Sequence, residues 1–301
     1  MVSMSVSNLN KSYGKHHVLK DVTFSVEAGE IVGFIGPNGS GKSTTMKCIA
    51  NLIFPDSGEV KIAGFDLAKS RNQALSNLSA LIEDPGLYYN LSGRDNLELF
   101  AGFRGIPRKR VKEVISFTGL ERSLKVQASK YSMGMKQRLA LGIAILTEPT
   151  FLILDEPFSG LDPHGVFELR EVIKKLAAQG CGILFSSHQI LEMEKIADRN
   201  IFIKEGEIVA TNQGESHSKT TYKFFYQGEA DLSFLHELKQ DGILTDFQPG
   251  EGVVLFSMAP KQNLNAVLEA FLNQGLAITS IVPQTTDIEN LYDEIYQRSP
   301  L

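Results

Sequence analysis

A glycine-rich segment near the N-terminus has the residues of a phosphate-binding loop. Residues 36–44 read Gly-Pro-Asn-Gly-Ser-Gly-Lys-Ser-Thr, a full match to the pattern G-x-x-x-x-G-K-[ST]. Glycines let the backbone wrap an anion, so that successive N–H groups and the positive end of a helix face it. Lys42 supplies a positive charge for the β- and γ-phosphates, and the Ser43 hydroxyl is placed to coordinate Mg²⁺. The predicted nucleotide-binding residues are Gly36, Pro37, Asn38, Gly39, Ser40, Gly41, Lys42, Ser43 and Thr44.

Two carboxylates at the end of an apolar run supply the second part of such a site. Residues 151–157 read Phe-Leu-Ile-Leu-Asp-Glu-Pro, which predicts a buried strand with Asp155 and Glu156 at its C-terminal end, where parallel sheets bind ligands. Adjacent strand residues point to opposite faces. We therefore expect Asp155 to hold the metal through water, and Glu156 to polarise the attacking water as a general base. His188 follows the next predicted strand and is expected beside the same site.

The elements that position these residues alternate between short β-branched runs and helical patterns. This alternation is typical of an α/β domain with a largely parallel sheet. The predicted strands of this domain are residues 30–36, 78–83, 151–156, 182–187 and 200–204.

Helical patterns fill the intervals between these strands. A helix is expected from Gly41 to about Ile53, and another after Asp162, which is a good N-cap before Pro163. Between residues 85 and 149 the pattern is almost wholly helical, with a capping box at Ser92. We expect an inserted helical subdomain there.

The composition changes near residue 210. Apolar residues nearly vanish over residues 210–221, which predicts a linker. The predicted elements after it are a strand, a helix, two strands, a helix and a strand, the order of a ferredoxin-like α+β unit. We therefore expect two domains, residues 1–212 and 213–301. A last helix places Ile288 and other apolar side chains on one face, which should dock on an apolar surface.

The overall composition limits the class of protein. The chain has 301 residues, a net charge of −5, 43% hydrophobic and 22% charged residues, which is typical of a globular protein. This balance argues against a protein that mainly coats nucleic acid, because neutralising phosphates needs clustered positive charge. No stretch approaches the roughly 18–20 apolar residues that cross a bilayer, and the first residues lack the apolar core of a signal peptide. Cys48 and Cys181 are expected to be buried thiols in a reducing cytosol.

Five motifs, in this order, resemble those of the ATP-binding subunits of ABC transporters. They are residues 36–44, 131–139, 151–157, 159–163 and 186–188. The resemblance covers roughly residues 1–212, and the segments 80–97 and 131–146 are most similar to exporters linked to resistance to bacitracin and other peptide antibiotics. It implies a P-loop NTPase cassette with a RecA-like core, an antiparallel β subdomain and the helical subdomain. It also implies that ATP and Mg²⁺ are bound and that ATP hydrolysis drives transport.

The resemblance also assigns roles to residues outside the glycine-rich loop. Tyr13 matches the aromatic residue that stacks on adenine, and His188 matches the switch histidine that senses the γ-phosphate. Ser132 and Gly134 match the signature loop, which contacts the γ-phosphate of ATP held by the partner subunit. Asp162 matches the loop that couples the two sites. The resemblance thus implies two ATP molecules between two head-to-tail copies, in a homodimer or in a heterodimer with a paralogue.

Two segments depart from the commonest pattern of the family. The signature usually reads Leu-Ser-Gly-Gly-Gln, whereas residues 131–135 keep the serine and the second glycine but lose the first glycine and the glutamine. Glu83 occupies the position of the glutamine that reaches Mg²⁺ and the permease. A carboxylate can ligate Mg²⁺, but it adds negative charge near the triphosphate. The expected metal ligands are therefore Ser43, Asp155 and Glu83.

The sequence thus favours the cytoplasmic motor of an ABC exporter that acts on peptide antibiotics or drugs. Its expected partner is a separately encoded integral membrane permease, which docks near residues 83–103 and holds the subunit at the cytoplasmic face of the cell membrane. No nucleic acid is expected as a partner, and the C-terminal domain is expected to be accessory or regulatory.

The alternative is a soluble ABC ATPase that acts on ribosomes or nucleic acid. Such relatives usually carry two cassettes or long coiled-coil insertions, and neither occurs in the sequence. The basic run at residues 108–112 is the only local feature that favours this alternative, and a solvated helix face accounts for it.

Overall fold

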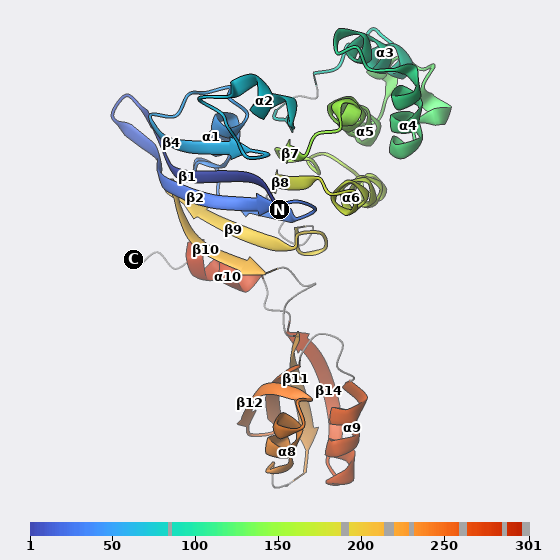
Figure 1. Cartoon of the computed structure of the whole chain (residues 1–301). Coiled ribbons are helices and arrows are strands. Elements are labelled where there is room, and N and C mark those ends of the chain that lie inside the picture. The colour runs from blue at the N-terminus through green and yellow to red at the C-terminus, as the bar shows by residue number, and fades with distance from the viewer. Residues whose placement is uncertain are drawn as a thin grey trace. The chain divides into compact units, whose positions relative to one another are not determined.

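The computed structural model describes residues 1–83, 86–187, 193–213, 220–228, 232–258, 264–284 and 288–296. The chain divides into two compact units, Met1–Asn212 and Gln213–Leu301, whose elements are shown in Figure 1. The division falls within strand β10 (Glu207–Gln213), so the start of the predicted linker at 210–221 is a strand. β10 is an edge strand of its sheet, which explains its polar sequence, because one side of an edge strand faces water. Residues 214–219 of the predicted linker lie outside the described residues.

A six-stranded sheet forms the centre of the first unit. Its strand order is β10-β9-β3-β8-β7-β6, and the pairs β9–β3, β3–β8, β8–β7 and β7–β6 are parallel. The bounds are β3 Ile31–Ile35, β6 Leu78–Leu81, β7 Phe151–Leu154, β8 Gly182–Ser186 and β9 Arg199–Lys204. Every residue of β3, β7 and β8 is buried, as in a parallel sheet covered on both faces. The five predicted strands are confirmed.

A second, antiparallel sheet packs on the first through a shared core. It has the order β2-β1-β4-β5, and its bounds are β1 Val2–Tyr13, β2 His16–Glu27, β4 Ser57–Ile62 and β5 Phe65–Asp66. The core between the sheets includes Val6, Phe24, Phe34 and Met46, and the rings of Phe24 and Phe34 stack with centroids 5.5 Å apart. Met46 lies on helix α1 (Lys42–Ile49), so this core fixes the helix that follows the glycine-rich loop.

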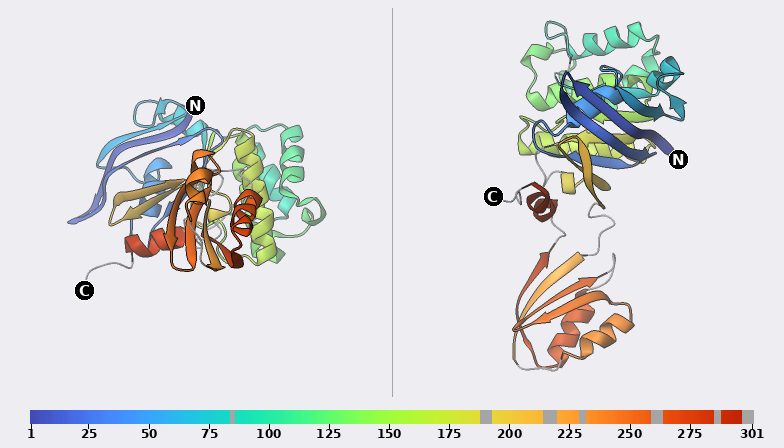
Figure 2. Two further views of the ribbon diagram at one scale, coloured as in Figure 1. Left: turned by 90° about the horizontal axis from the view of Figure 1, so that it is seen from below. Right: turned by 90° about the vertical axis from the view of Figure 1, so that its left-hand side faces the viewer.

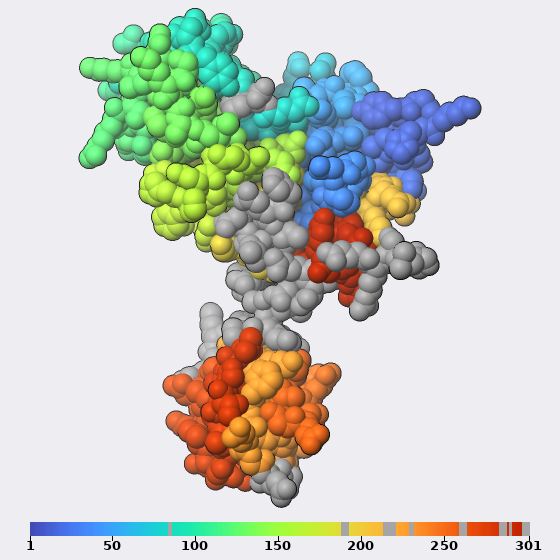
Figure 3. Space-filling model, turned by 180° about the vertical axis from the view of Figure 1, so that it is seen from behind, coloured from blue at the N-terminus to red at the C-terminus, as the bar shows by residue number. Residues whose placement is uncertain are grey.

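The insertion between β6 and β7 is helical, as predicted. It contains α3 (Gly93–Phe103), α4 (Arg108–Thr118) and α5 (Met133–Ala144), and Figure 2 shows these helices, in green, to one side of the strands. In the surface view of Figure 3 they form a lobe of their own. The predicted capping box is confirmed, because the Ser92 hydroxyl accepts from the Asp95 N–H while the Asp95 carboxylate accepts from the Ser92 N–H.

Two further helices lie in the first unit, and another lies near the end of the chain, in the second unit. Helix α2 (Arg71–Ser76) precedes β6, and α6 (Pro163–Ala178) joins β7 to β8 with Asp162 as its N-cap. The final helix is α10 (Ile288–Tyr296), on which Ile288 is buried. None of the described helices is long and apolar enough to cross a membrane.

The C-terminal unit has the predicted ferredoxin-like order. Its elements are β11 (Thr220–Gln227), α8 (Phe234–Gln240), β12 (Leu244–Gly250), β13 (Val253–Met258), α9 (Leu264–Asn273) and β14 (Ala277–Gln284). The strands form an antiparallel sheet of order β12-β13-β11-β14, and its core includes Phe224, Phe256 and Phe271. The prediction that Pro249 and Gly250 separate two strands was wrong, because β12 continues through both. β12 is an edge strand, where a proline can be accommodated.

Candidate nucleotide site

The glycine-rich segment forms the connection from β3 to α1. Gly39 and Gly41 have φ angles of 81° and 111°, in the left-handed region that favours glycine. A Cβ atom on Gly36 would lie 2.5 Å from the Ile203 carbonyl oxygen and from Ser40 Oγ, so a side chain does not fit there. The Ser40 hydroxyl is buried and has no hydrogen-bond partner. This closely wrapped backbone with an unpaired buried hydroxyl fits the binding of an anion.

Lys42 folds back into this loop. Its Nζ donates to the carbonyl oxygens of Gly36, at 2.6 Å, and Pro37, at 3.1 Å, and the residue is 8% exposed. Burial lowers the pKa of Lys42, whereas the carboxylates of Glu156 and Asp155 raise it. The structure therefore brings the predicted lysine and both predicted carboxylates within electrostatic reach of one another.

Ser186, the last residue of β8, connects the chain segments of the two carboxylates. Its hydroxyl donates to Asp155 Oδ1 at 2.5 Å and accepts from the Glu156 N–H at 2.9 Å. Glu156 has a φ of 52°, a conformation that costs energy in a residue other than glycine and persists where its surroundings fix it. Sequence reasoning missed Ser186 as a site residue, although it lies in the Ser-Ser-His motif at 186–188 that was used for the resemblance.

Replacing Ser186 with alanine is expected to lower kcat about tenfold, because Asp155 loses the hydrogen bond that orients it. The free energy of unfolding should fall by about 1–2 kcal/mol, the usual cost of a lost buried hydrogen bond. Steady-state ATPase assays and urea unfolding measure the two effects. Ser79→Ala is the matched control, because the Ser79 hydroxyl donates to the Ala144 carbonyl at 2.6 Å. This variant should lose stability but keep the parent's kcat. An unchanged kcat in Ser186→Ala contradicts the orienting role.

Glu83 and Tyr13 lie at the ends of two strands. Glu83 follows β6, has a φ of 67° and is paired with Lys47 on α1, the two charged groups being 2.6 Å apart. Its role as a metal ligand stays a prediction. Tyr13 ends β1 and is 49% exposed, with the Lys11 ammonium 5.6 Å from its ring centroid. An exposed ring of this kind can stack on a base, as the resemblance implies.

The predicted signature and coupling residues meet at two neighbouring helix N-termini. Ser132 caps α5 by accepting from the Met135 N–H at 3.3 Å, and Asp162 caps α6 by accepting from the Gly165 N–H at 2.8 Å. A Cβ atom on Gly134 would lie 3.6 Å from the Gly165 Cα, so the two helix starts are in close contact. Their positive ends are suited to an anion. His188 lies outside the described residues.

The oxygen atoms at the site suit Mg²⁺ only together with a nucleotide. Within the described parts of the chain, no group of three or more His, Cys, Asp or Glu side chains could hold a metal ion. Ser43 is exposed at the second position of α1, and Asp155 directly follows β7. Hydroxyl and carboxylate oxygens are ligands that Mg²⁺ prefers, and phosphates and water complete its octahedron.

Comparison with known proteins identifies the family of this site. A protein-family model described as ABC transporter matches residues 19–159. The bacitracin transport ATP-binding protein BcrA of Bacillus licheniformis is 38% identical over 96% of this chain and 95% of the relative. The chain belongs to the ATP-binding subunits of ABC transporters. The BcrA protein of Enterococcus faecalis is 34% identical over 97% of the chain and 96% of its own length.

A solved structure extends the comparison to the fold and the reaction. It is the dimer of an ATP-binding cassette in a post-hydrolysis state, bound to ADP and Pi, with a TM-score of 0.63 and 26% identity over 70% of this chain and 98% of that one. The predicted P-loop NTPase cassette is confirmed, and this ABC subunit is an ATPase. The relatives support the transporter over the ribosomal or nucleic-acid alternative.

Both cysteines are buried, free thiols, as predicted. Burial raises the pKa of Cys48 to about 11 and that of Cys181 to about 12. At neutral pH both therefore stay protonated and are poor nucleophiles.

Proposed function

We propose that this ABC subunit powers the export of peptide antibiotics or drugs through a separately encoded membrane permease. The observation that carries the proposal is the similarity to bacitracin transport proteins over 96–97% of the chain, which includes the C-terminal unit. Residues 1–212 form the ATP-binding cassette in this proposal.

In this proposal the loop residues bind the phosphates, and the carboxylates hold the metal ion and activate water. The backbone N–H groups available within residues 36–44, all but that of Pro37, donate to the phosphates, and Lys42 turns from the Gly36 carbonyl to the β- and γ-phosphates. Ser43 and Asp155, with Glu83 as a third ligand, would hold Mg²⁺, which would supply positive charge beside the phosphates. Glu156 orients a water molecule and accepts its proton as the water oxygen attacks the γ-phosphorus and the bond to the ADP oxygen breaks.

Residues at the two helix N-termini complete the site of a second copy. We propose a head-to-tail homodimer in which Ser132 and Gly134 contact the γ-phosphate of the ATP bound by the partner. Asp162 couples the two sites, Tyr13 stacks on adenine and His188 senses the γ-phosphate. The dimeric arrangement of the related cassette bound to ADP and Pi supports this proposal.

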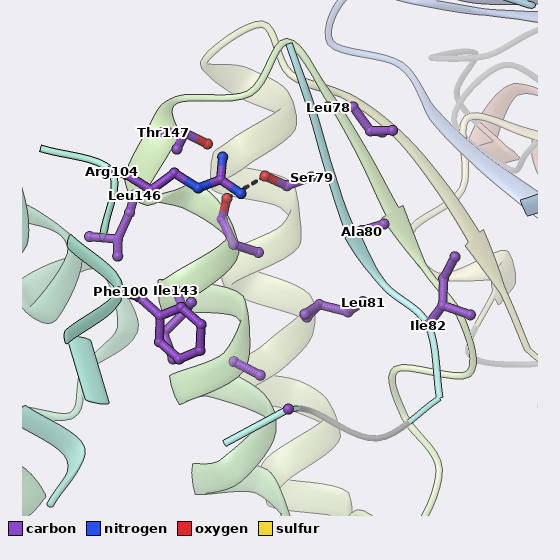
Figure 4. A pocket seen from close by; sticks show the side chains of 13 residues that line it. Leu78, Ser79, Ala80, Leu81, Ile82, Phe100, Arg104, Ile143, Leu146 and Thr147 are labelled. Carbon is purple, nitrogen blue, oxygen red and sulfur yellow. Dashed lines mark hydrogen bonds between the residues drawn. The ribbon is translucent and has the colours of Figure 1, made fainter. Parts of the chain in front are cut away.

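A groove between β6 and the helical subdomain is the proposed docking surface for the permease. Its cavity of about 330 Å³ is lined by residues 78–82 and by residues of α3 and α5, and Figure 4 shows Phe100 and Ile143 on one side and Leu81 on the other. The Phe100 ring lies 5.9 Å from that of Tyr88 and 6.3 Å from that of Phe103. An uncovered aromatic cluster beside a groove is typical of a protein interface. The subunit would then be held at the cytoplasmic face of the membrane by the permease alone.

Phe103→Asp is expected to reduce the amount of permease recovered with the subunit from detergent-solubilised membranes by roughly tenfold, because the interface would have to desolvate a carboxylate. Phe103 is 69% exposed, so the ATPase rate of the isolated chain should stay unchanged. Phe65→Asp on the antiparallel sheet, where Phe65 is 36% exposed, serves as the control. If the parent chain, Phe103→Asp and Phe65→Asp all recover the same amount of a multi-span membrane protein, docking at this groove is contradicted.

We propose an accessory, regulatory role for residues 213–301. These residues form a compact unit with a core of their own. All the proposed nucleotide-binding residues belong to the first unit. Unchanged ATPase rate and permease binding after removal of this unit would contradict the role.

A further inference from the structure

Glu83 stands where the family most often has a glutamine, and the structure shows what holds its carboxylate. Glu83 follows β6, which pairs in parallel with β7. Asp155 directly follows β7 and donates its N–H to the carbonyl of Leu81, the last residue of β6, at 2.8 Å. Glu83 is therefore anchored beside the carboxyl end of the strand that leads to the metal aspartate. Its own φ of 67° shows that the backbone here is constrained by its surroundings.

The partner of Glu83 is Lys47, which lies one turn and a half along α1 from Lys42. Lys47 Nζ lies 2.6 Å from Glu83 Oε1, and the two side chains are 27% and 70% exposed. The hydrogen bond that Lys47 donates to the Glu83 carboxylate raises the pKa of Lys47, with further contributions from the charges of Glu83 and Asp155. The Lys47 ammonium therefore contacts Glu83 directly and lies within electrostatic range of Asp155.

The charges at the site explain why such a lysine is needed. Asp155 and Glu156 act electrostatically on Lys42 within the loop, and Glu83 adds a third carboxylate just after the strand that pairs with the one leading to Asp155. Each further carboxylate weakens the binding of an anion in a partly desolvated site. An ion pair as exposed as Lys47–Glu83 contributes little to folding stability. We therefore expect Lys47 to act by offsetting the charge of Glu83 and by fixing the position of its carboxylate.

We propose that Lys47 is a positioning residue for Glu83: its ammonium holds the carboxylate beside the metal site and offsets the charge that glutamate adds there. This inference rests on the proposed nucleotide site. It makes Lys47 necessary for tight Mg-ATP binding when position 83 carries glutamate, and dispensable when that position carries the uncharged amide.

The test is a double-mutant cycle for nucleotide binding in a chain that also carries Glu156→Gln, so that turnover does not interfere. The dissociation constant of Mg-ATP is measured by displacement of a fluorescent ATP analogue, for Lys47→Gln, Glu83→Gln and the double variant. Lys47→Gln should weaken binding roughly fivefold, the effect of a nearby charge at intermediate dielectric. In the Glu83→Gln background the same change should alter binding by less than about twofold, and Lys47→Arg should restore most of the affinity.

Lys61→Gln is the matched control, since Lys61 forms an equally short pair, at 2.6 Å, with Glu59 on β4. It should leave Mg-ATP binding unchanged, and thermal unfolding without nucleotide should be the same for Lys47→Gln and Lys61→Gln. An equal loss of affinity from Lys47→Gln in both backgrounds, or no loss in either, overturns the inference. If the chain that carries only Glu156→Gln does not bind Mg-ATP, the nucleotide site itself is contradicted.

Discussion

Lys42→Ala is expected to lower ATP hydrolysis by about two to three orders of magnitude. In the proposed mechanism the Lys42 ammonium is the charge that the loop places against the phosphates. The hydrogen bonds of 2.6 and 3.1 Å to the Gly36 and Pro37 carbonyls show that it already lies inside the loop. Because alanine leaves the backbone N–H groups in place, ATP binding should weaken without being lost. The reaction, however, loses a charge that acts on the transferred phosphate. Steady-state ATPase assays and ATP-binding titrations measure the two losses.

The folded state should survive this substitution. Burial lowers the pKa of Lys42, which means that the fold disfavours the charged form of this residue, and removing it relieves that cost. Thermal unfolding of Lys42→Ala without nucleotide should therefore match the parent within a few degrees. Lys61→Ala on β4 is the control for loss of a lysine elsewhere and should keep full activity. Substantial hydrolysis by Lys42→Ala would show that the loop does not hold the phosphates as described.

Glu156→Gln is the second change with a large expected effect. An amide keeps the size of the side chain but does not accept a proton from water, so the rate of hydrolysis should fall by roughly a thousandfold, within the usual range for loss of a general base. ATP binding should persist, because Lys42, Ser43 and the loop backbone are unchanged. Single-turnover hydrolysis with a fixed amount of radiolabelled ATP measures the chemical step. A rate within tenfold of the parent would assign the base to another residue.

Local signals predicted the parts of the fold that depend on neighbouring residues. The glycines of residues 36–44, the apolar runs before Asp155 and the cap at Ser92 each act within one element, and the structure has them where the pattern places them. The error at Pro249 has a different origin. Whether a proline ends a strand depends on which strand lies beside it, and the edge position of β12 follows from the pairing of the whole sheet.

The contacts that sequence reasoning could not supply join residues far apart in the chain. Ser186 lies 31 positions from Asp155, and Lys47 lies 36 positions from Glu83. A serine or a lysine is common at a surface or strand end, so its type alone does not indicate its partner. The close approach of Gly134 to Gly165 likewise depends on how α5 packs on α6, which no local pattern determines.

The most direct test of this account is the mass of the Glu156→Gln chain with and without Mg-ATP. Because ATP is proposed to lie between the glycine-rich loop of one copy and the α5 N-terminus of the other, ATP that is bound but not hydrolysed should hold two copies together. Sedimentation velocity should give about twice the chain mass of 33.2 kDa with Mg-ATP, and the single-chain mass with ADP or after the further change Lys42→Ala. A Glu156→Gln chain that binds ATP and still sediments as a single copy would contradict the account.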